Sequence, residues 1–229
     1  MLNQNSLFVV SQCILNHMIN RIEQTLKTYS AWRLGDDVAR RDEAAVLMLI
    51  TDEENPHVIL TRRTVGLSSH AGEVAFPGGK RDPEDSNLIV TALRETEEEI
   101  GISGSDIRIL GSLSDILSKH KLRVEPWVGL VSPQVNLIPN PDEIESVFRV
   151  PISFLIEPGT ARFDQFQGFD GKTRYAPAWD YQGYDIWGLT AWVLAELLNA
   201  AFDAKVATIP TISGWGATPG SGTARRGPR

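Results

Sequence analysis

The chain has 229 residues, of which 42% are hydrophobic and 22% are charged, so it can bury the core of one large domain and is not broadly disordered. Its 22 Lys and Arg against 29 Asp and Glu give a net charge of -7, which argues against a protein that binds nucleic acid. The single cysteine, Cys13, favours a reducing compartment, so we expect a cytoplasmic protein. No apolar run approaches the roughly 18 residues that a membrane-spanning helix needs, so we expect no membrane partner.

Apolar periodicity divides the chain into helices and strands. In chain order, the predicted elements are a helix at 14–29, a hairpin of strands at 44–51 and 57–61, a helix at 86–100, strands at 107–113, 122–131 and 144–150, and a helix at 187–202. Weaker strand patterns surround Phe163, Tyr175 and Ile186, where Gly and Pro interrupt the sequence. Strands with flanking helices predict an α/β sandwich. Glycines and prolines dominate the end of the chain, so we expect a disordered tail at 204–229.

The predicted helix at 86–100 has defined ends and one apolar side. Asp85 or Ser86 can act as its N-cap, and Gly101 follows its last turn. The apolar side is formed by Leu88, Ile89, Ala92, Leu93 and Ile100. This side is expected to pack on a core, which fixes the directions in which the polar side chains of the same helix point.

Three carboxylates share another face of this helix. At about 100° per residue, Glu95 and Glu99 lie roughly 40° apart, and Glu98 lies about 60° on the other side of Glu95. Like charges at this spacing repel, and acidic residues in a last turn oppose the helix dipole. A divalent cation offsets this repulsion, because Mg²⁺ prefers oxygen ligands and is commonly shared between carboxylates and phosphates. The alternative is a solvated acidic face.

A glycine pair stands shortly before the acidic helix. Phe76 and Pro77 precede Gly78 and Gly79, and the charged segment 80–85 follows. Paired glycines let a phosphate or a metal ion approach the main chain closely, although such pairs also occur in ordinary turns. Its position shortly before the glutamate-bearing helix favours the binding role over an ordinary turn.

The glycine pair and the acidic helix together resemble the Nudix box, whose pattern is G-x5-E-x7-R-E-U-x-E-E-x-G-U, with U a bulky apolar residue. Its second half is matched by Arg94, Glu95, Glu98, Glu99, Gly101 and Ile102. Thr96 stands at the first apolar position. The chain is one residue longer between Gly79 and Arg94 than the pattern, which makes Asp85 the nearest substitute for the family's first glutamate.

A second resemblance concerns the segment just before the box. It is similar to the additional signature of the coenzyme A pyrophosphatase branch, with Leu60-Thr61-Arg62-Arg63, Leu67, His70-Ala71-Gly72-Glu73-Val74 and Phe76-Pro77-Gly78-Gly79. Ser68 stands where that branch usually has arginine, and residues 186–191 also look like its C-terminal helix. The resemblance covers 42–203 and implies a Nudix-type α/β/α sandwich with a mixed β-sheet and a loop-helix-loop catalytic motif. A helical extension at 1–41 lies outside it.

The resemblance also implies an activity: hydrolysis of a diphosphate linkage with Mg²⁺ or Mn²⁺, most specifically of coenzyme A to 3',5'-ADP and 4'-phosphopantetheine. The implied metal ligands are Glu95, Glu98, Glu99 and the Gly79 carbonyl. Arg94 would orient these glutamates by ion pairing, and the implied contacts to the nucleotide substrate come from Arg62, Arg63, His70 and Gly78. His70 is equally well explained as a structural residue. Alternatives are another nucleoside diphosphate linked to a second group, such as ADP-ribose or NADH, and a ligand-binding module without catalysis.

The resemblance to the Nudix family also implies a further carboxylate beyond the box, as the base or as a metal ligand. Glu143 and Glu145 share a face of the strand that follows them, by the period of two residues. Of these two we select Glu143 as the catalytic candidate, with a solvated strand end as the alternative. The sequence leaves the oligomeric state open, a homodimer included.

Overall fold

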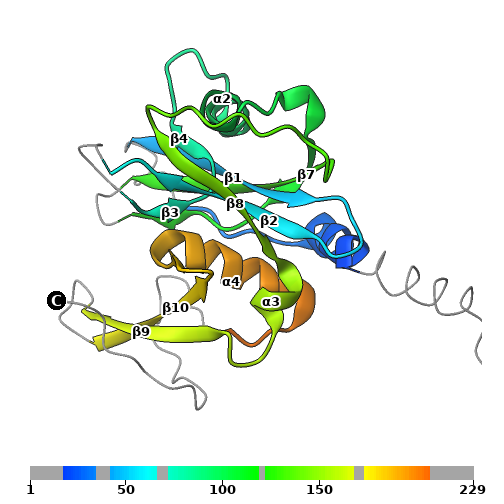
Figure 1. The fold of residues 1–229 in the computed structure, drawn as a ribbon, viewed down its shortest axis with the longest axis vertical. Helices are drawn as coiled ribbons and strands as arrows, with labels where there is room; N and C mark the ends of the chain where they lie inside the picture. Colours follow the sequence, from blue (N-terminus) through cyan, green and yellow to red (C-terminus); the bar gives the residue numbers. More distant parts are fainter. Residues whose placement is uncertain (1–17, 35–41, 66–71, 119–121, 168–172, 207–229) are drawn as a thin grey trace, which may run out of the picture.

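The computed structural model describes residues 18–34, 42–65, 72–118, 122–167 and 173–206. A mixed sheet lies between two helices, with α2 (Leu88–Ile100) on one face and α4 (Gly188–Phe202) on the other (Figure 1). The sheet is built from β1 (Glu43–Thr51), β2 (His57–Arg63), β3 (Val74–Ala75), β4 (Gly78–Lys80), β5 (Arg108–Ser112), β6 (Ile116–Leu117), β7 (Arg123–Val131) and β8 (Ile144–Pro151). These layers form an α/β/α sandwich.

The strand order places β1 at the centre of the sheet. Along the main path the order is β3-β2-β1-β7-β5, while β4 pairs with β1, β6 with β7 and β8 with β2. β1 runs parallel to β7, and its pairings with β2 and β4 are antiparallel. β1 is therefore buried on both faces, which explains its continuous apolar sequence.

Each face of the sheet has its own apolar core. On β1, Leu47 and Leu49 pack in the core under α2, while Met48 and Ile50 pack in the core on the α4 side. This alternation follows from the period of two in a strand. The same central strand thus fixes the positions of both helices.

A second, three-stranded sheet lies beyond α4 (Figure 1). It consists of β9 (Ala161–Gln167), β10 (Thr173–Tyr181) and β11 (Tyr184–Ile186), and α3 (Ile152–Ile156) leads into it from β8. These are the strands for which the sequence pattern was weak. The fully buried Trp179 on β10 contributes to the core on the α4 side, so the small sheet is part of the same packed unit.

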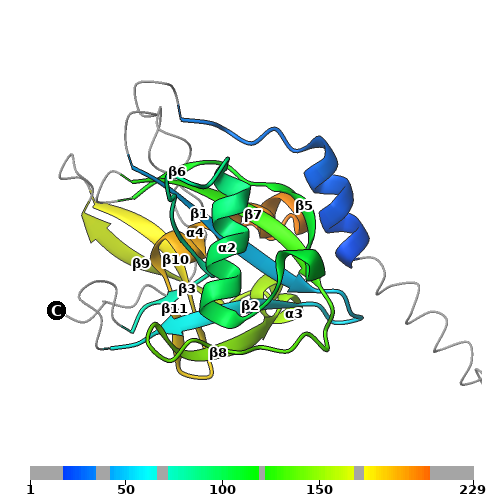
Figure 2. The same ribbon diagram turned by 90° about the horizontal axis from the view of Figure 1, so that it is seen from above.

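The segment before β1 docks on the main sheet. A helix over residues 18–28 lies beside β5 (Figure 2) and buries Ile22 completely. Arg33 Nη1 donates to the buried Asp115 carboxylate at 3.0 Å, and the Leu34 amide donates to the same carboxylate at 3.0 Å. Tyr29 donates its hydroxyl to Glu196 of α4 at 2.7 Å, and burial raises the pKa of Tyr29 to about 12. The described part of this extension is thus fastened to both the sheet and α4.

The N-cap of α2 differs from the expected one. Asn87 caps the helix, because its side chain accepts a hydrogen bond from the Val90 amide at 3.1 Å. The expectation for Asp85 or Ser86 was wrong, since Asp85 turns inward and is buried. Gly101 ends the helix in the left-handed conformation at φ 73°, as predicted.

The C-terminal end of the described chain continues past α4. Asn199 holds Val206 through two hydrogen bonds, and Val206 is buried. The predicted tail beyond residue 206 lies outside the described residues. Among the helices of the described residues, none is long and apolar enough to cross a membrane.

Candidate active site

The glycine pair lets β4 lie directly against β1 and α2. Gly78 has φ 149°, and a Cβ added there would lie 2.3 Å from the Ala45 carbonyl oxygen. A Cβ added at Gly79 would lie 2.4 Å from the carboxyl carbon of Glu95. The contact at Gly78 is with backbone, so that position requires glycine, whereas a side chain at Gly79 would displace the Glu95 carboxylate. The main chain of β4 therefore approaches the first carboxylate of α2 closely.

Arg94 holds two glutamates of α2 at once. Its Nη1 donates to Glu95 Oε1 and to Glu98 Oε2, both at 3.0 Å. Its Nη2 also donates to the Lys80 carbonyl at 3.1 Å, which ties the helix to the end of β4. The orienting role expected for Arg94 thus has a structural basis in these contacts.

Asp85 in turn holds Arg94. Its two carboxylate oxygens accept hydrogen bonds from Arg94 Nε at 3.2 Å and Nη2 at 3.0 Å. Thr91 Oγ1 and the Asp82 amide also donate to Asp85, at 2.9 Å and 3.0 Å. These contacts, led by the Arg94 hydrogen bonds, lower the pKa of Asp85 to about 2 and raise that of Arg94. Asp85 is therefore a buried anchor for the arginine.

Arg63 plays a similar part on the other side of α2. Its Nη1 lies 3.0 Å from Glu99 Oε1, and its Nη2 lies 3.5 Å from Glu143 Oε2. The Gly78 amide donates to Glu99 Oε2 at 3.2 Å. Sequence reasoning assigned Arg63 to the substrate, whereas in this structure it bridges Glu99 and Glu143. Arg63 also lines an open cleft beside these glutamates.

Two of the glutamates are destabilised as anions. Glu99 is 2% exposed, and its burial raises its pKa to about 7 against the opposing effects of the Gly78 amide and Arg63. Burial also raises the pKa of Glu95, again against the effect of Arg94. A cation placed beside both carboxylates would restore their charged forms.

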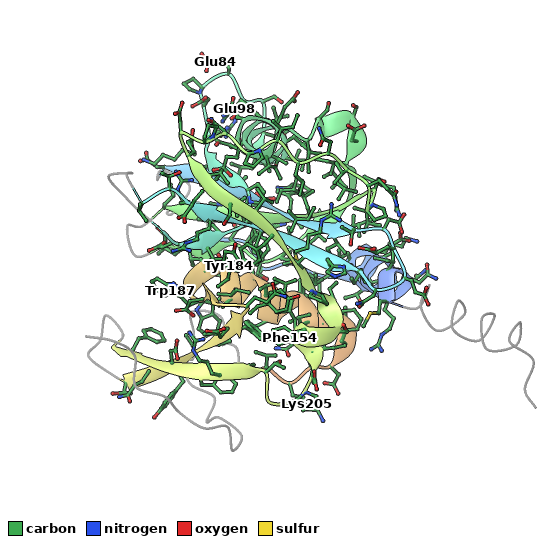
Figure 3. The ribbon with its side chains drawn as sticks, in the orientation of Figure 1. Glu84, Glu98, Phe154, Tyr184, Trp187 and Lys205 are labelled. Carbon is green, nitrogen blue, oxygen red and sulfur yellow. The ribbon has the colours of Figure 1, made fainter. Side chains whose placement is uncertain are left out.

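A cleft of about 1200 Å³ opens beside these residues. One end is lined by Arg63, Gly79, Glu95, Glu99 and Glu143. Glu98 does not line the cleft, and its side chain is 55% exposed. Figure 3 shows Glu98 on the α2 side of the sheet, away from Trp187 on the α4 side. The structure thus brings Glu95, Glu99 and Glu143 together and leaves Glu98 at the rim.

The other residues selected from the sequence lie elsewhere. Arg62 pairs with Glu145 at 3.4 Å and lines a second cavity of about 350 Å³, which shares Glu73, Val74 and Trp187 with the cleft. The structure therefore does not bring Arg62 to the glutamates. His70 and Ser68 lie outside the described residues.

The donor set at the glutamate end suits a hard divalent cation. The Glu95 carboxylate lies against the main chain of Gly79, Glu99 accepts from the Gly78 amide, and Glu143 shares Arg63 with Glu99. In the described part of the chain, no three Asp, Glu, His or Cys side chains stand close enough together to bind a metal as they are placed. Arg63 contacts Glu99 and Glu143, and Arg94 contacts Glu95. Metal binding would therefore require these arginine side chains to turn away.

Sequence reasoning missed two features of this site. The inward orientation of Asp85 had no signal in the pattern beyond its place near the box. The second end of the cleft is formed by α4 and the small sheet, including Trp187 and Trp192. Its only signal was a set of large apolar residues at the start of the last predicted helix, which also suits a buried helix face.

The sandwich, the glycine turn and the glutamate-bearing helix define the Nudix class of hydrolases. A family model described as NUDIX domain matches residues 41–167. A protein of Photorhabdus laumondii named as an uncharacterized Nudix hydrolase NudL is 38% identical over 183 residues, which span 80% of this chain and 95% of that protein. The chain belongs to the Nudix family and is a Nudix hydrolase, and the predicted sandwich is confirmed.

A plant protein and a solved structure extend the comparison. The mitochondrial Nudix hydrolase 15 of Arabidopsis thaliana is 38% identical over 174 residues, which span 72% of this chain and 61% of that protein. An Ap4A hydrolase of C. elegans is 20% identical with a TM-score of 0.42, covering 50% of this chain and 83% of that one. The family assignment rests on the family model and the bacterial relative.

Proposed function

We propose that this Nudix hydrolase cleaves the diphosphate linkage of coenzyme A or its derivatives. The observation that supports hydrolysis is the group of Glu95, Glu99 and Glu143 at one end of a cleft large enough for a nucleotide conjugate. The coenzyme A branch is supported by the sequence of 60–79, which contributes Arg63, Gly78 and Gly79 to that same end. The single Cys13 supports a reducing compartment such as the cytoplasm.

Mg²⁺ or Mn²⁺ is part of the proposal. Glu95, Glu98, Glu99 and the carbonyl of Gly79 would hold it, with Glu98 turning from the rim toward the cleft. The ion would neutralise the diphosphate and lower the pKa of a bound water. Arg94 would act as a positioning residue, since it already contacts both Glu95 and Glu98.

Glu143 is the proposed general base, because it lines the cleft beside Glu99, with which it shares Arg63. It would accept a proton from a water molecule whose oxygen bonds to one phosphorus of the diphosphate. The bond from that phosphorus to the bridging oxygen would break, and the bridging oxygen would leave on the other phosphate. Arg63 and the Gly78 amide would contact the phosphates, and Arg62 and His70 are proposed for the nucleotide end of the substrate.

The test is a hydrolysis screen with Mg²⁺ over coenzyme A, ADP-ribose, NADH and nucleoside triphosphates. We expect coenzyme A to have the highest kcat/KM and 3',5'-ADP to be released. Faster cleavage of another compound would assign the chain to a different Nudix substrate class. Binding of coenzyme A without hydrolysis of any compound would favour a ligand-binding module.

A sharper test uses the 3'-phosphate of coenzyme A. A protein of net charge -7 needs a local cation to accept this additional anion, and a charged contact can discriminate strongly. We expect coenzyme A to exceed dephospho-coenzyme A by at least about tenfold in kcat/KM, which corresponds to about 1.4 kcal/mol. Equal rates on the two compounds would contradict recognition of the 3'-phosphate.

A further inference from the structure

The segment that leads into β8 lies against the last turn of α2. A helix leaves the carbonyls of its final residues without partners inside the helix. Two amides of this segment bind such carbonyls. The Ile138 amide donates to the Ile100 carbonyl at 2.8 Å, and the Asn140 amide donates to the Glu99 carbonyl at 2.9 Å. The glutamate-bearing end of α2 therefore holds the segment through its main chain.

Gly101 allows the segment to come this close to the helix. A Cβ added at Gly101 would lie 2.9 Å from the Cβ of Ile138 and 3.3 Å from its carbonyl oxygen. A side chain at this position would push the segment away from α2. Gly101 thus ends the helix and also makes room for the segment that leads to Glu143.

Asn140 shapes the turn that ends at Glu143. Its side-chain Oδ1 accepts a hydrogen bond from the Asp142 amide at 3.2 Å. Its carbonyl accepts from the amides of Glu143 at 3.1 Å and Ile144 at 2.8 Å. Pro141 follows directly and disfavours the helical conformation at Asn140, and asparagine commonly binds the amide two residues later in such turns. One residue thus binds the helix with its amide and the turn with its two oxygens.

β2 holds the same turn from its other side. The Thr64 amide donates to the Glu143 carbonyl at 2.8 Å, and the preceding residue, Arg63, lies 3.5 Å from Glu143 Oε2. The Glu143 side chain is 42% exposed, so packing alone does not fix its direction. When Arg63 turns away, as metal binding requires, the main-chain contacts of the turn still keep this carboxylate near Glu99.

We propose that Asn140 is a positioning residue that fixes the general base Glu143 relative to the glutamates of α2. This inference rests on the proposed function, in which Glu143 accepts a proton from the attacking water. Asn140 does not line the cleft, so it acts through Glu143. General bases contribute on the order of 10²–10⁴-fold and need a correct distance to the proton. A turn that shifts by about 1 Å therefore loses a large part of this contribution.

The experiment measures kcat, KM and the Mg²⁺ concentration of half-maximal rate with coenzyme A. We expect Asn140→Ala to reduce kcat at least about fivefold, with KM and the Mg²⁺ requirement within about twofold of wild type, because only the base is displaced. Asn140→Asp keeps an oxygen that can accept from the Asp142 amide. This conservative variant should therefore retain kcat within about twofold of wild type.

A double-mutant cycle separates positioning from general stabilisation. Glu143→Gln removes the base and should reduce kcat at least about a hundredfold. Adding Asn140→Ala to Glu143→Gln should reduce kcat by less than about a further twofold, because Asn140 acts only through this glutamate. Thermal unfolding of each variant reports whether the fold is retained.

Asn55→Ala is the matched control. Asn55 also lies in a turn, between β1 and β2, and its Oδ1 accepts a hydrogen bond from Ser153 Oγ at 3.0 Å. It does not line the cleft, so its loss should leave kcat within about twofold of wild type.

Two results would overturn the inference while the proposed function stands. One is wild-type kcat in Asn140→Ala. The other is an equal fold loss from Asn140→Ala in wild type and in Glu143→Gln, which would make Asn140 a residue of general stability. Failure of the proposed function has a different signature. Wild-type protein would then not cleave coenzyme A, or Glu143→Gln would keep wild-type kcat, and the inference would fall with the base.

Discussion

Glu99 is the most buried glutamate of α2, and it contacts both Arg63 and the Gly78 amide. Replacing it with glutamine removes one negative charge of the proposed metal site and leaves the size of the side chain nearly unchanged. We expect Glu99→Gln to reduce turnover at least about a hundredfold at saturating Mg²⁺, with the fold retained. Steady-state hydrolysis and thermal unfolding measure the two effects.

The control for this variant is Glu97→Gln. Glu97 is exposed and lies outside the cleft, so its loss should leave turnover within about twofold of wild type. Near wild-type turnover of Glu99→Gln would show that the metal site has been assigned to the wrong carboxylates.

Gly79 lies so close to Glu95 that a side chain at this position would displace the carboxylate. In Gly79→Ala the new Cβ would meet the Glu95 carboxylate at 2.4 to 2.5 Å, so that the carboxylate has to move. We expect at least about a thirtyfold loss of kcat and weaker Mg²⁺ activation, because displacing a reacting group by about 1 Å can cost a hundredfold.

Gly104→Ala provides the comparison for Gly79→Ala. A Cβ at Gly104 would meet Leu93 at 3.6 Å, which is an ordinary contact, so activity should be preserved. If Gly79→Ala retained wild-type kcat and Mg²⁺ dependence, catalysis would not depend on the close approach of β4 to Glu95.

Asp85 makes the stability of the protein depend on pH. Its pKa is lowered from 3.8 to about 2 in the folded state, so its contribution is complete above pH 3.8 and is lost as the pH falls toward 2. Asp85→Asn should reduce the free energy of unfolding by on the order of 1–2 kcal/mol at pH 7. The difference from wild type should become smaller at pH 3, as measured by urea unfolding. A difference that stays constant from pH 7 to pH 3 would contradict the ionised state of Asp85.

At the scale of elements, the segment before β1 is joined to the catalytic region by a series of ion pairs. Arg33 and Arg123 both contact Asp115, and Arg123 Nη1 contacts Glu43 at 2.8 Å. Glu43 in turn accepts a hydrogen bond from Arg81 at 2.7 Å. Since Arg81 follows β4 directly, the extension supports the same turn that presents Gly79 to Glu95.

Arg33→Ala tests this connection. It removes one arginine from a carboxylate whose side chain is fully buried, so we expect a loss of about 2 kcal/mol in the free energy of unfolding. The melting temperature should fall by roughly 4–8 °C.

The matched control is Arg108→Ala. Arg108 also pairs with the extension, through Glu23, but its side chain is 58% exposed, and exposed pairs contribute little. An equal effect of the two variants would mean that the buried Asp115 carboxylate does not depend on Arg33.

At the scale of the whole molecule, the sequence predicted the elements with strong periodicity. The hairpin of β1 and β2, helix α2, strands β5, β7 and β8 and helix α4 all occur close to their expected positions. The small sheet was poorly predicted, because Gly and Pro interrupt it and its strands gain stability from packing on α4. A local sequence pattern does not show how a strand packs against a helix that is distant in the chain.

The candidate site was predictable in part for the same reason. Helical spacing placed Glu95 and Glu99 together, because both belong to one element. It also grouped Glu98 with them, yet Arg94 holds Glu98 at the rim. The partners of Arg63 come from different elements, α2 and the turn before β8, so only the fold could reveal the bridge between Glu99 and Glu143.

The parallel pairing of β1 with β7 has a consequence for how the protein forms. Glu43 pairs with Arg123, 80 residues later in the chain. During synthesis β1 can pair with β2 and β4, while its other edge stays open until β7 has left the ribosome. An apolar strand with an open edge can pair with another chain, and pairings between distant segments form slowly. Refolding from denaturant should therefore be slow, with a yield that falls as protein concentration rises, and we expect aggregation to begin at the segment Glu43–Thr51.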